Sequence, residues 1–227
     1  MILEIIATNI RDVKAASDYG ADRIELCVGM KEEGFTPSYG LIESALEMAT
    51  IPINVIIRSH SQSFFYESSE VDTMIRDIRM VRKLGANGIV IGALTENGQV
   101  DVEVMKRLLE EAEGLDVTFH RAIDFSRNLE ETLEALTQFN QVKRILTAGG
   151  RKPATESVPT IKRLMELAEN THLNIMPGYG LRVETFKEFY DEVQPKEIHF
   201  GSGVREENSF MKQIDPEKVE SIKQIYS

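Results

Sequence analysis

VTFHRAID, residues Val117–Asp124, joins a short apolar strand directly to three ionisable side chains. Asp116–Phe119 is rich in β-branched and aromatic residues, which predicts a strand. This strand runs straight into His120 and Arg121, and Asp124 follows shortly after. Ionisable groups are costly to bury unless they meet partners or a ligand, so the end of this strand is a candidate site.

A short apolar run followed by a longer segment of helical period recurs along the whole chain. Eight such strands alternating with eight helical segments predict an α/β fold, a (β/α)8 barrel of the TIM type. No low-complexity stretch divides the chain, so residues 1–227 are expected to form a single domain. An open doubly wound sheet is the alternative, which the lack of a clear dinucleotide fingerprint disfavours. The predicted strands are Ile2–Ile6, Arg23–Cys27, Ile53–Ile57, Gly88–Ile91, Asp116–Phe119, Arg144–Thr147, Leu173–Met176 and Glu197–Phe200.

Helix signals between the strands agree with this alternation. Apolar residues within 71–84 recur at helical spacing, and Gly85 stands after them as a helix C-cap. Asn9 and Asn128 each precede an acidic third residue, which is typical of a helix N-terminus. Asp215 stands before a first-turn proline in the same way. These signals predict helices in the segments that separate the strands.

Composition and charge exclude several classes of function. The 227 residues carry 26 basic and 37 acidic side chains, a net charge of −11, which argues against binding to nucleic acid or to an anionic membrane. No apolar run reaches the roughly 18 residues of a membrane span, and no secretory signal is evident. Cys27 is the only cysteine, and a lone thiol suits a reducing compartment, so a cytoplasmic location is expected.

Polar residues interrupt or follow the strands where a (β/α)8 barrel carries its active site. Glu4 and Glu25 each interrupt an apolar strand and are expected to point into the barrel. Carboxylates, imidazoles and guanidiniums in one mouth predict general acid–base chemistry on a small anionic substrate. The alternative is a structural ion-pair network, such as Glu4 with Arg58, that fills the barrel interior. The candidate catalytic residues are Glu4, Glu25, Arg58, His120, Arg121, Asp124 and His199.

Glycine-rich turns follow the last two strands and predict an anion site. Glycines let backbone amides approach a ligand closely, and the loops after strands seven and eight are a common phosphate site in this fold. The alternative is that these glycines only form the turns. The candidate ligand-binding residues are Thr147, Gly178, Gly180, Gly201, Ser202 and Gly203.

Two irregular segments could cover this end of the barrel. Arg58–Ser69 is long, polar and aromatic, which is typical of a lid or a binding loop. Arg205–Gln213 is either a second arm over the mouth or a mobile terminus.

Cys27 allows three interpretations. With Met30 it offers a thiolate and a thioether, which are soft ligands for Cu(I). Near His120 it could act as a nucleophile. A lone cysteine at a strand end is most often a small buried hydrophobe. The sequence has no Cys-x-x-Cys or His-x-x-x-His pair, so a tetrahedral zinc site is not predicted.

Several of these segments resemble the signature segments of the CutC copper-homeostasis family. They occur in order between Glu4 and about Ser202. The resemblance implies a TIM-type barrel, a cytoplasmic location, a role in copper handling through cuprous-ion binding, and self-association into a homo-oligomer. The segments are Asp22–Cys27 (DRIELC), Gly34–Ser38 (GFTPS), Phe119–Asp124 (FHRAID), Ile145–Thr147 (ILT) and Met176–Gly180 (MPGYG).

The chain departs from this family pattern at the copper site. Family members proposed to bind copper have a cysteine at the end of the first strand, where this chain has Ile6. Cys27 therefore stands alone, and a single thiolate is a poor cage for Cu(I). Arg58 is followed by SHSQSF instead of the family's Pro-Arg-Gly-Gly-Asp-Phe type of run. The acidic and basic residues of the mouth all fit the pattern.

Two classes of function therefore compete: a copper-binding protein, and a barrel enzyme (isomerase, lyase or hydrolase) acting on a small anionic or phosphorylated metabolite. No strand interior carries a lysine suited to a Schiff base, which disfavours an aldolase of that type. A catalytically inactive scaffold that acts through an oligomer surface is a third alternative. In the enzyme, the expected roles are anion binding by Arg58 or Arg121, base by Glu4 or Glu25, and acid or electrophile by His120, oriented by Asp124.

Overall fold

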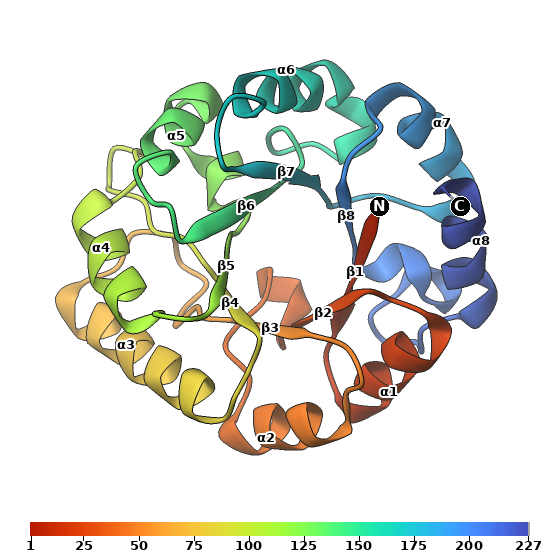
Figure 1. Cartoon of the computed structure of the whole chain (residues 1–227), viewed down its shortest axis with the longest axis horizontal. Coiled ribbons are helices and arrows are strands. Elements are labelled where there is room, and N and C mark those ends of the chain that lie inside the picture. The colour runs from red at the N-terminus through yellow and green to blue at the C-terminus, as the bar shows by residue number, and fades with distance from the viewer. Residues whose placement is uncertain (227) are drawn as a thin grey trace.

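Eight strands form the wall of a barrel, and the helices surround them (Figure 1). The computed structural model describes residues 1–226, and within them each strand leads to the helix of the same number. The strands are β1 Ile2–Ala7, β2 Arg23–Leu26, β3 Ile53–Ile56, β4 Gly88–Ile91, β5 Asp116–Phe119, β6 Val142–Thr147, β7 Asn174–Pro177 and β8 Glu197–Phe200. The helices are α1 Ile10–Tyr19, α2 Tyr39–Met48, α3 Ser68–Lys83, α4 Val102–Glu111, α5 Leu129–Leu136, α6 Val158–Ala168, α7 Val183–Val193 and α8 Pro216–Tyr226.

The strands are parallel and follow the order β7-β6-β5-β4-β3-β2-β1-β8. The first strand pairs with both the second and the last, and β7 lies next to β8 in Figure 1. The Asn174 side-chain amide of β7 donates a hydrogen bond to Glu197 of β8 at 3.0 Å across this seam. The sheet is therefore nearly closed. The predicted TIM-type barrel is confirmed, and the open doubly wound sheet is wrong.

Helix ends lie where the capping signals predicted them. The Asn9 side chain accepts a hydrogen bond from the Asp12 backbone N–H at 3.0 Å, and Asn128 accepts one from Glu131 at 3.1 Å. Both satisfy a backbone donor that the first turn of a helix leaves free. Gly85 follows α3 with a φ of +84°, in the left-handed region that favours glycine.

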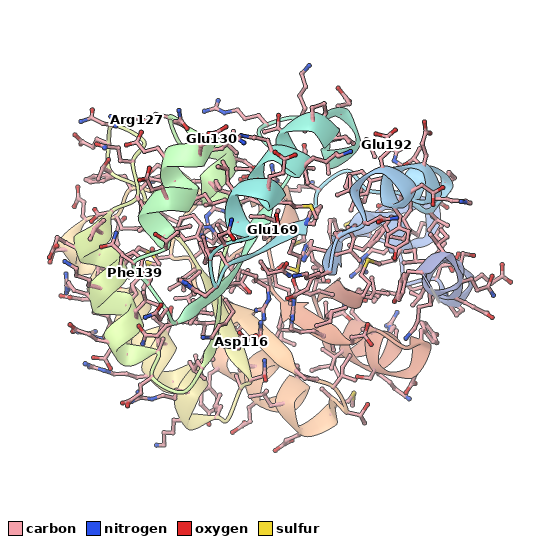
Figure 2. All side chains as sticks on the ribbon, turned by 45° about the horizontal axis from the view of Figure 1, so that its top comes forward. Asp116, Arg127, Glu130, Phe139, Glu169 and Glu192 are labelled. Atoms are coloured by element: carbon pink, nitrogen blue, oxygen red, sulfur yellow. The ribbon has the colours of Figure 1, made fainter. Side chains whose placement is uncertain are left out.

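Alternate residues of each strand face opposite sides of the barrel wall. On β1, Leu3 and Ile5 point outward and are fully buried against the helices, whereas Glu4 points inward. The inner face carries polar residues on several other strands, such as Arg23 of β2 and His199 of β8, and an apolar patch that includes Ile56 of β3 and Val90 of β4. Charged side chains such as Glu130, Glu169 and Glu192 cover the outside of the helices (Figure 2). None of the helices described in residues 1–226 is long and apolar enough to span a membrane.

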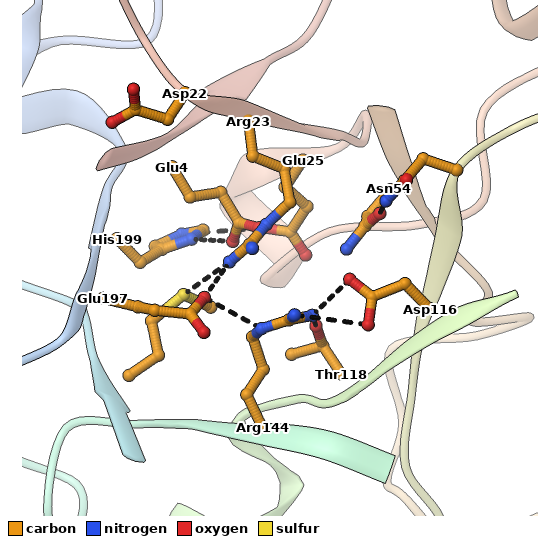
Figure 3. A network of polar contacts seen from close by, with 12 residues as sticks. Glu4, Asp22, Arg23, Glu25, Asn54, Asp116, Thr118, Arg144, Glu197 and His199 are labelled. Carbon is orange, nitrogen blue, oxygen red and sulfur yellow. Dashed lines mark hydrogen bonds and ion pairs between the residues drawn. The ribbon is translucent and has the colours of Figure 1, made fainter. Parts of the chain in front are cut away.

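A network of ion pairs fills the barrel interior at the end where the strands begin (Figure 3). Arg23 of β2 donates from Nε to Glu4 and from Nη2 to Glu197. Arg144 of β6 pairs with Glu197 at 2.9 Å and with Asp116 at 2.8 Å. Charges taken out of water need such partners. We call Glu4, Arg23, Asp116, Thr118, Arg144 and Glu197 the floor network.

The structural alternative raised above is thus partly present, but with a different arginine. The predicted Glu4–Arg58 pair is wrong, because Arg58 lies beyond the end of β3 and donates instead to the backbone carbonyls of Glu32 and Gly34. Glu4 sits deeper, where its in-register neighbours are Arg23 on β2 and His199 on β8.

The C-terminal segment forms an arm over the strand C-termini. Arg205 is 1% exposed, and it donates to the carboxylate of Asp12 at 2.7 Å and to the carbonyl of Ile6 at 3.0 Å. The Phe210 ring packs over the Arg205 guanidinium at 5.0 Å. Of the two predicted alternatives for Arg205–Gln213, the arm over the mouth is the one the structure contains.

Candidate active site at the mouth of the barrel

A cavity of about 360 Å³ opens at the C-terminal ends of the strands. We call it the mouth cavity. Six of the predicted catalytic or metal residues line it: Glu25, Cys27, Arg58, His120, Arg121 and His199. The glycine-turn residues Gly180, Gly201, Ser202 and Gly203 also line it, whereas Glu4, Asp124, Thr147 and Gly178 lie behind its wall.

Glu25 presents a buried carboxylate to this cavity. Its residue is 4% exposed, and no hydrogen bond reaches it from the described residues. The His199 Nε2 lies 3.5 Å from Glu25 Oε2. Burial raises the pKa of Glu25 to about 7, with the charge of Glu4 adding to the effect and those of His199 and Arg23 opposing it. A carboxylate of this kind exchanges a proton near neutral pH.

Glu4 is also buried, but both of its carboxylate oxygens have partners. One oxygen accepts from Arg23, and the other lies 2.8 Å from His199 Nδ1. Burial acts to raise the pKa of Glu4, but the charge of Arg23 and the hydrogen bond to His199 outweigh it and hold the pKa at about 2. Burial likewise acts to lower the pKa of His199, and the contacts with Glu4 and Glu25 reverse this and raise it. Glu4 therefore stays ionised and positions His199, which leaves Glu25 as the carboxylate that faces a ligand.

His120 lines the cavity and has one ring nitrogen without a hydrogen-bond partner among the described residues. Its Nδ1 accepts a hydrogen bond from the Ala122 backbone N–H at 3.2 Å, so the ring proton of the neutral form belongs on Nε2. The Nε2 atom is buried and has no hydrogen-bond partner among the described residues. Burial, followed by the charge of Arg58, lowers the pKa of His120 to about 3. His120 is therefore a neutral hydrogen-bond donor, and Phe64 packs against its ring at 5.0 Å.

Asp124 positions a different residue from the one predicted. The expectation that Asp124 orients His120 is wrong, because the carboxylate is occupied elsewhere. It accepts from the Thr147 hydroxyl, from the backbone N–H of Ala148 at 3.0 Å and from Arg121 Nε at 2.8 Å. Thr147 thus contacts Asp124, which in turn holds Arg121 in place, and its role in ligand binding stays a prediction.

Three arginines line the mouth cavity, although the chain as a whole is acidic, and Arg121 among them pairs with Asp124 at 2.8 Å and Glu33 at 3.6 Å. The Arg121 guanidinium lies over the Tyr179 ring at 3.9 Å, and Arg58 lies over Phe64 at 4.8 Å. Arg182 adds a third, exposed guanidinium at the rim. Opposing them, the lining carries two carboxylates, Glu25 and Glu33, within the described residues. A fixed, stacked guanidinium is well suited to bind a carboxylate or phosphate.

The glycines after β7 and β8 have packing reasons of their own. A Cβ added at Gly203 would lie 2.0 Å from the carbonyl oxygen of Leu181. One at Gly178 would lie 2.6 Å from the Leu146 side chain, and one at Gly201 would lie 2.8 Å from Phe210. Close packing therefore accounts for these glycines without a ligand, and the anion site in these loops stays a prediction.

Cys27 lines the cavity within an apolar patch. Its residue is 1% exposed and packs with Ile6, Ile56 and Val90. Its Sγ lies 3.2 Å from the Met30 Sδ, so the two sulfur atoms of the predicted soft pair do meet. Burial raises the pKa of Cys27 well above its usual value, which favours the neutral thiol and disfavours a nucleophile.

Sequence reasoning missed several residues that build this site. Arg23 stands two positions before Glu25 on the same strand face, so its inward direction could have been inferred from strand alternation. Arg182 and Phe210, which both line the cavity, carry no local signal, because loops from distant parts of the chain bring them there.

Comparisons with known proteins agree with the fold and with the family resemblance of the sequence. The model of the CutC family matches residues 1–204. A CutC family protein of Pasteurella multocida is 41% identical over 206 residues, 90% of this chain and 84% of that protein. One of Bacteroides fragilis is 42% identical over 202 residues, 88% of this chain and 80% of that protein.

Solved structures add two further likenesses. The crystal structure of CutC from Streptococcus agalactiae, a protein provisionally assigned to copper homeostasis, has a TM-score of 0.82 and 31% identity, covering 88% of this chain and 98% of that chain. Phosphoribosyl anthranilate isomerase from Thermococcus kodakaraensis has a TM-score of 0.63 and 18% identity, covering 99% of this chain and 97% of that one, which shows a shared barrel fold.

Proposed function

The chain belongs to the CutC family, and from that premise we propose that its mouth cavity binds a small anionic metabolite and performs general acid–base chemistry on it. One observation carries the proposal. The His120 Nε2 is buried without a hydrogen-bond partner among the described residues, and the buried Glu25 carboxylate, which contacts His199 Nε2 at 3.5 Å, belongs to a residue that lines the same cavity as His120. Buried polar groups without partners are costly, so a ligand that satisfies both is the expected occupant.

Each group has a distinct role in this proposal. Arg121, held by Asp124 and stacked on Tyr179, binds the negative charge of the metabolite. Glu25 accepts a proton, because its pKa of about 7 is matched to neutral pH. His120 donates a hydrogen bond from Nε2 to a ligand oxygen.

Metabolite capture tests this proposal through Arg121. The purified protein is expected to retain small anions from a cell extract, read by mass spectrometry, and the Arg121→Gln variant is expected to bind them about tenfold or more weakly, since a charge-assisted hydrogen bond is lost. Arg127→Gln is the matched control, because that guanidinium is exposed and pairs with Glu131 outside the mouth cavity. Equal retention by wild type and Arg121→Gln would count against the proposal.

Copper binding is a second candidate, favoured by the contact between Cys27 and Met30. CutC of S. agalactiae is assigned provisionally to copper homeostasis, and we extend that role to this chain. Cu(I) prefers soft ligands, and the thiol and the thioether, with Sγ and Sδ 3.2 Å apart, supply two. Ile6, which packs beside Cys27, offers no third.

Anaerobic titration with Cu(I) decides this second candidate. Direct binding at the sulfur pair requires one equivalent of Cu(I) whose affinity falls about tenfold or more in Cys27→Ala, since the thiolate is the strongest ligand present. Met211→Leu is the control, because that thioether is 86% exposed and absent from the cavity lining. Identical titrations of Cys27→Ala and wild type would remove copper binding at this position.

We also infer a cytoplasmic location, which the lone buried thiol supports, because a single free cysteine suits a reducing compartment. Self-association into a homo-oligomer stays a prediction from the family resemblance.

A further inference from the structure

We propose that the metabolite carries a carbonyl group next to a C–H bond, and that the protein removes this proton to form an enolate in the mouth cavity. The inference rests on the proposed function and narrows it to one class of reaction and substrate. It follows from the tautomer of His120, from the surroundings of Glu25 and from the position of the arginines.

His120 is placed to donate a hydrogen bond to the oxygen of the carbonyl group. The Ala122 backbone N–H occupies Nδ1 of His120 and thereby fixes the proton on Nε2, which has no partner among the described residues, and His120 lines the cavity. A neutral imidazole with a fixed N–H is a suitable donor to a carbonyl oxygen that gains negative charge during the reaction. Arg58 lines the same cavity and favours negative charge at that position.

Glu25 is the group that would remove the proton from the carbon next to the carbonyl group. When Glu25 is ionised, its carboxylate can accept hydrogen bonds but cannot donate them. No described residue donates a hydrogen bond to it. Its neighbours include polar groups, namely His199 at 3.5 Å and Asn54 in register on β3, but the wall on its other side is apolar. Ile6 is its in-register neighbour on β1, and Cys27 lies two residues further along the same face of β2. Such a wall accommodates a carbon skeleton rather than a hydroxyl group. The proton that Glu25 is placed to remove therefore belongs to carbon.

Two arginines and the volume of the cavity indicate the charge and size of the ligand. Arg121 and Arg182 line the outer part of the cavity and provide a place for a carboxylate or phosphate group. A volume of about 360 Å³ lies in the range of small-molecule sites. A short carbonyl compound with one terminal anionic group meets all of these surfaces.

The proposed step is balanced without a further reactant. The C–H bond breaks and its proton goes to a Glu25 oxygen, while the electron pair forms a C=C bond and the carbonyl π pair moves to oxygen. His120 Nε2–H donates to the resulting enolate oxygen and keeps its proton. Return of the proton from Glu25 to the same carbon gives hydrogen exchange with solvent, and its return to the neighbouring carbon of a hydroxycarbonyl compound, with proton transfer between the two oxygens, gives an isomer.

Oxalate tests the inference, because it is a planar dianion that copies the enolate of a 2-oxo acid, whereas malonate carries two carboxylates without that shape. Calorimetric titration of the full chain, after removal of metals with EDTA, is expected to show oxalate binding about tenfold or more tightly than malonate. His120→Phe is expected to abolish this preference, and His120→Gln, which restores an N–H donor, to recover part of it. His172→Gln, whose imidazole contacts the Phe139 carbonyl outside the mouth cavity, is the control.

A measurement on the unmodified protein guards against a folding defect in the variants. The proton NMR resonance of His120 Nε2–H is expected to move downfield when oxalate, but not malonate, is added. Equal affinities for the two anions, with weaker binding of both in Arg121→Gln, would overturn the enolate inference and leave the proposed anion site standing. Absence of binding for both anions would overturn the two together.

Discussion

Arg23→Met is expected to lower the free energy of unfolding by about 3–5 kcal/mol, because it leaves Glu4 and Glu197 buried without the guanidinium that they share. Arg144 still pairs with Glu197, but Glu4 keeps only His199. Urea denaturation near neutral pH, monitored by circular dichroism, measures the change.

The size of this effect depends on burial, which a surface pair can test. Arg79→Met removes a guanidinium of comparable reach that pairs with Glu111 while 57% exposed, and it is expected to cost at most about 1 kcal/mol. Adding Glu4→Gln to Arg23→Met is expected to recover part of the loss, because the uncompensated charge disappears. If Arg23→Met and Arg79→Met cost the same, the floor network does not hold the barrel together.

The pH dependence of the same variant has a definite sign. The pKa of Glu4 falls from its usual 4.5 to about 2 in the folded protein, so its contribution to stability is present above pH 4.5 and is lost as the pH falls toward 2. Arg23→Met removes the main cause of that lowering. The difference between wild type and Arg23→Met is therefore expected to narrow below pH 4.5.

Glu25→Gln is expected to abolish the proposed chemistry and, at the same time, to stabilise the protein in mildly alkaline solution. A general base contributes about 10²–10⁴-fold in rate, so turnover of an identified substrate, or solvent hydrogen exchange into it, is expected to fall by that factor. Burial raises the pKa of Glu25 from 4.5 to about 7, which means that the fold favours the protonated carboxyl. Ionising it therefore costs stability as the pH rises from 4.5 through 7.

Glutamine removes that cost because it cannot ionise. The gain in unfolding free energy is expected to be on the order of 2 kcal/mol above about pH 8, after allowance for the lost contact with His199, and to be negligible below about pH 4.5. Glu188→Gln, an exposed change on the outer side of α7, is expected to alter neither stability nor turnover. A gain that is the same at both pH values would show that Glu25 does not titrate abnormally.

The repeating strands and the convergence of their polar ends were predictable from sequence. Apolar runs of strand length separated by helical segments leave few architectures other than a closed parallel barrel. Glu25, His120 and His199 could be placed at one mouth because each occupies an inward position near a strand end. The errors in strand boundaries are small: β6 begins at Val142 rather than Arg144.

The partners of those residues were not predictable, because they depend on stagger between strands. Glu4 lies level with Arg23 and His199, whereas Arg58 lies beyond the end of β3, and only the register of the closed sheet shows this. Asp124 is close to His120 in sequence, yet the turn that follows β5 directs its carboxylate to Arg121 and Thr147. Loop conformation decided that contact, and no spacing rule encodes it.

The arm formed by Arg205–Gln213 couples ligand occupancy of the mouth cavity to the docking of a segment near the C-terminus. It lies beyond residue 204, where the match to the family model stops, yet its Phe210 supplies part of the wall against which any occupant must rest. A molecule that touches this wall when the arm is docked holds the arm down by mass action. Slower hydrogen–deuterium exchange of the backbone amides of 205–213 would then report that a ligand occupies the mouth cavity.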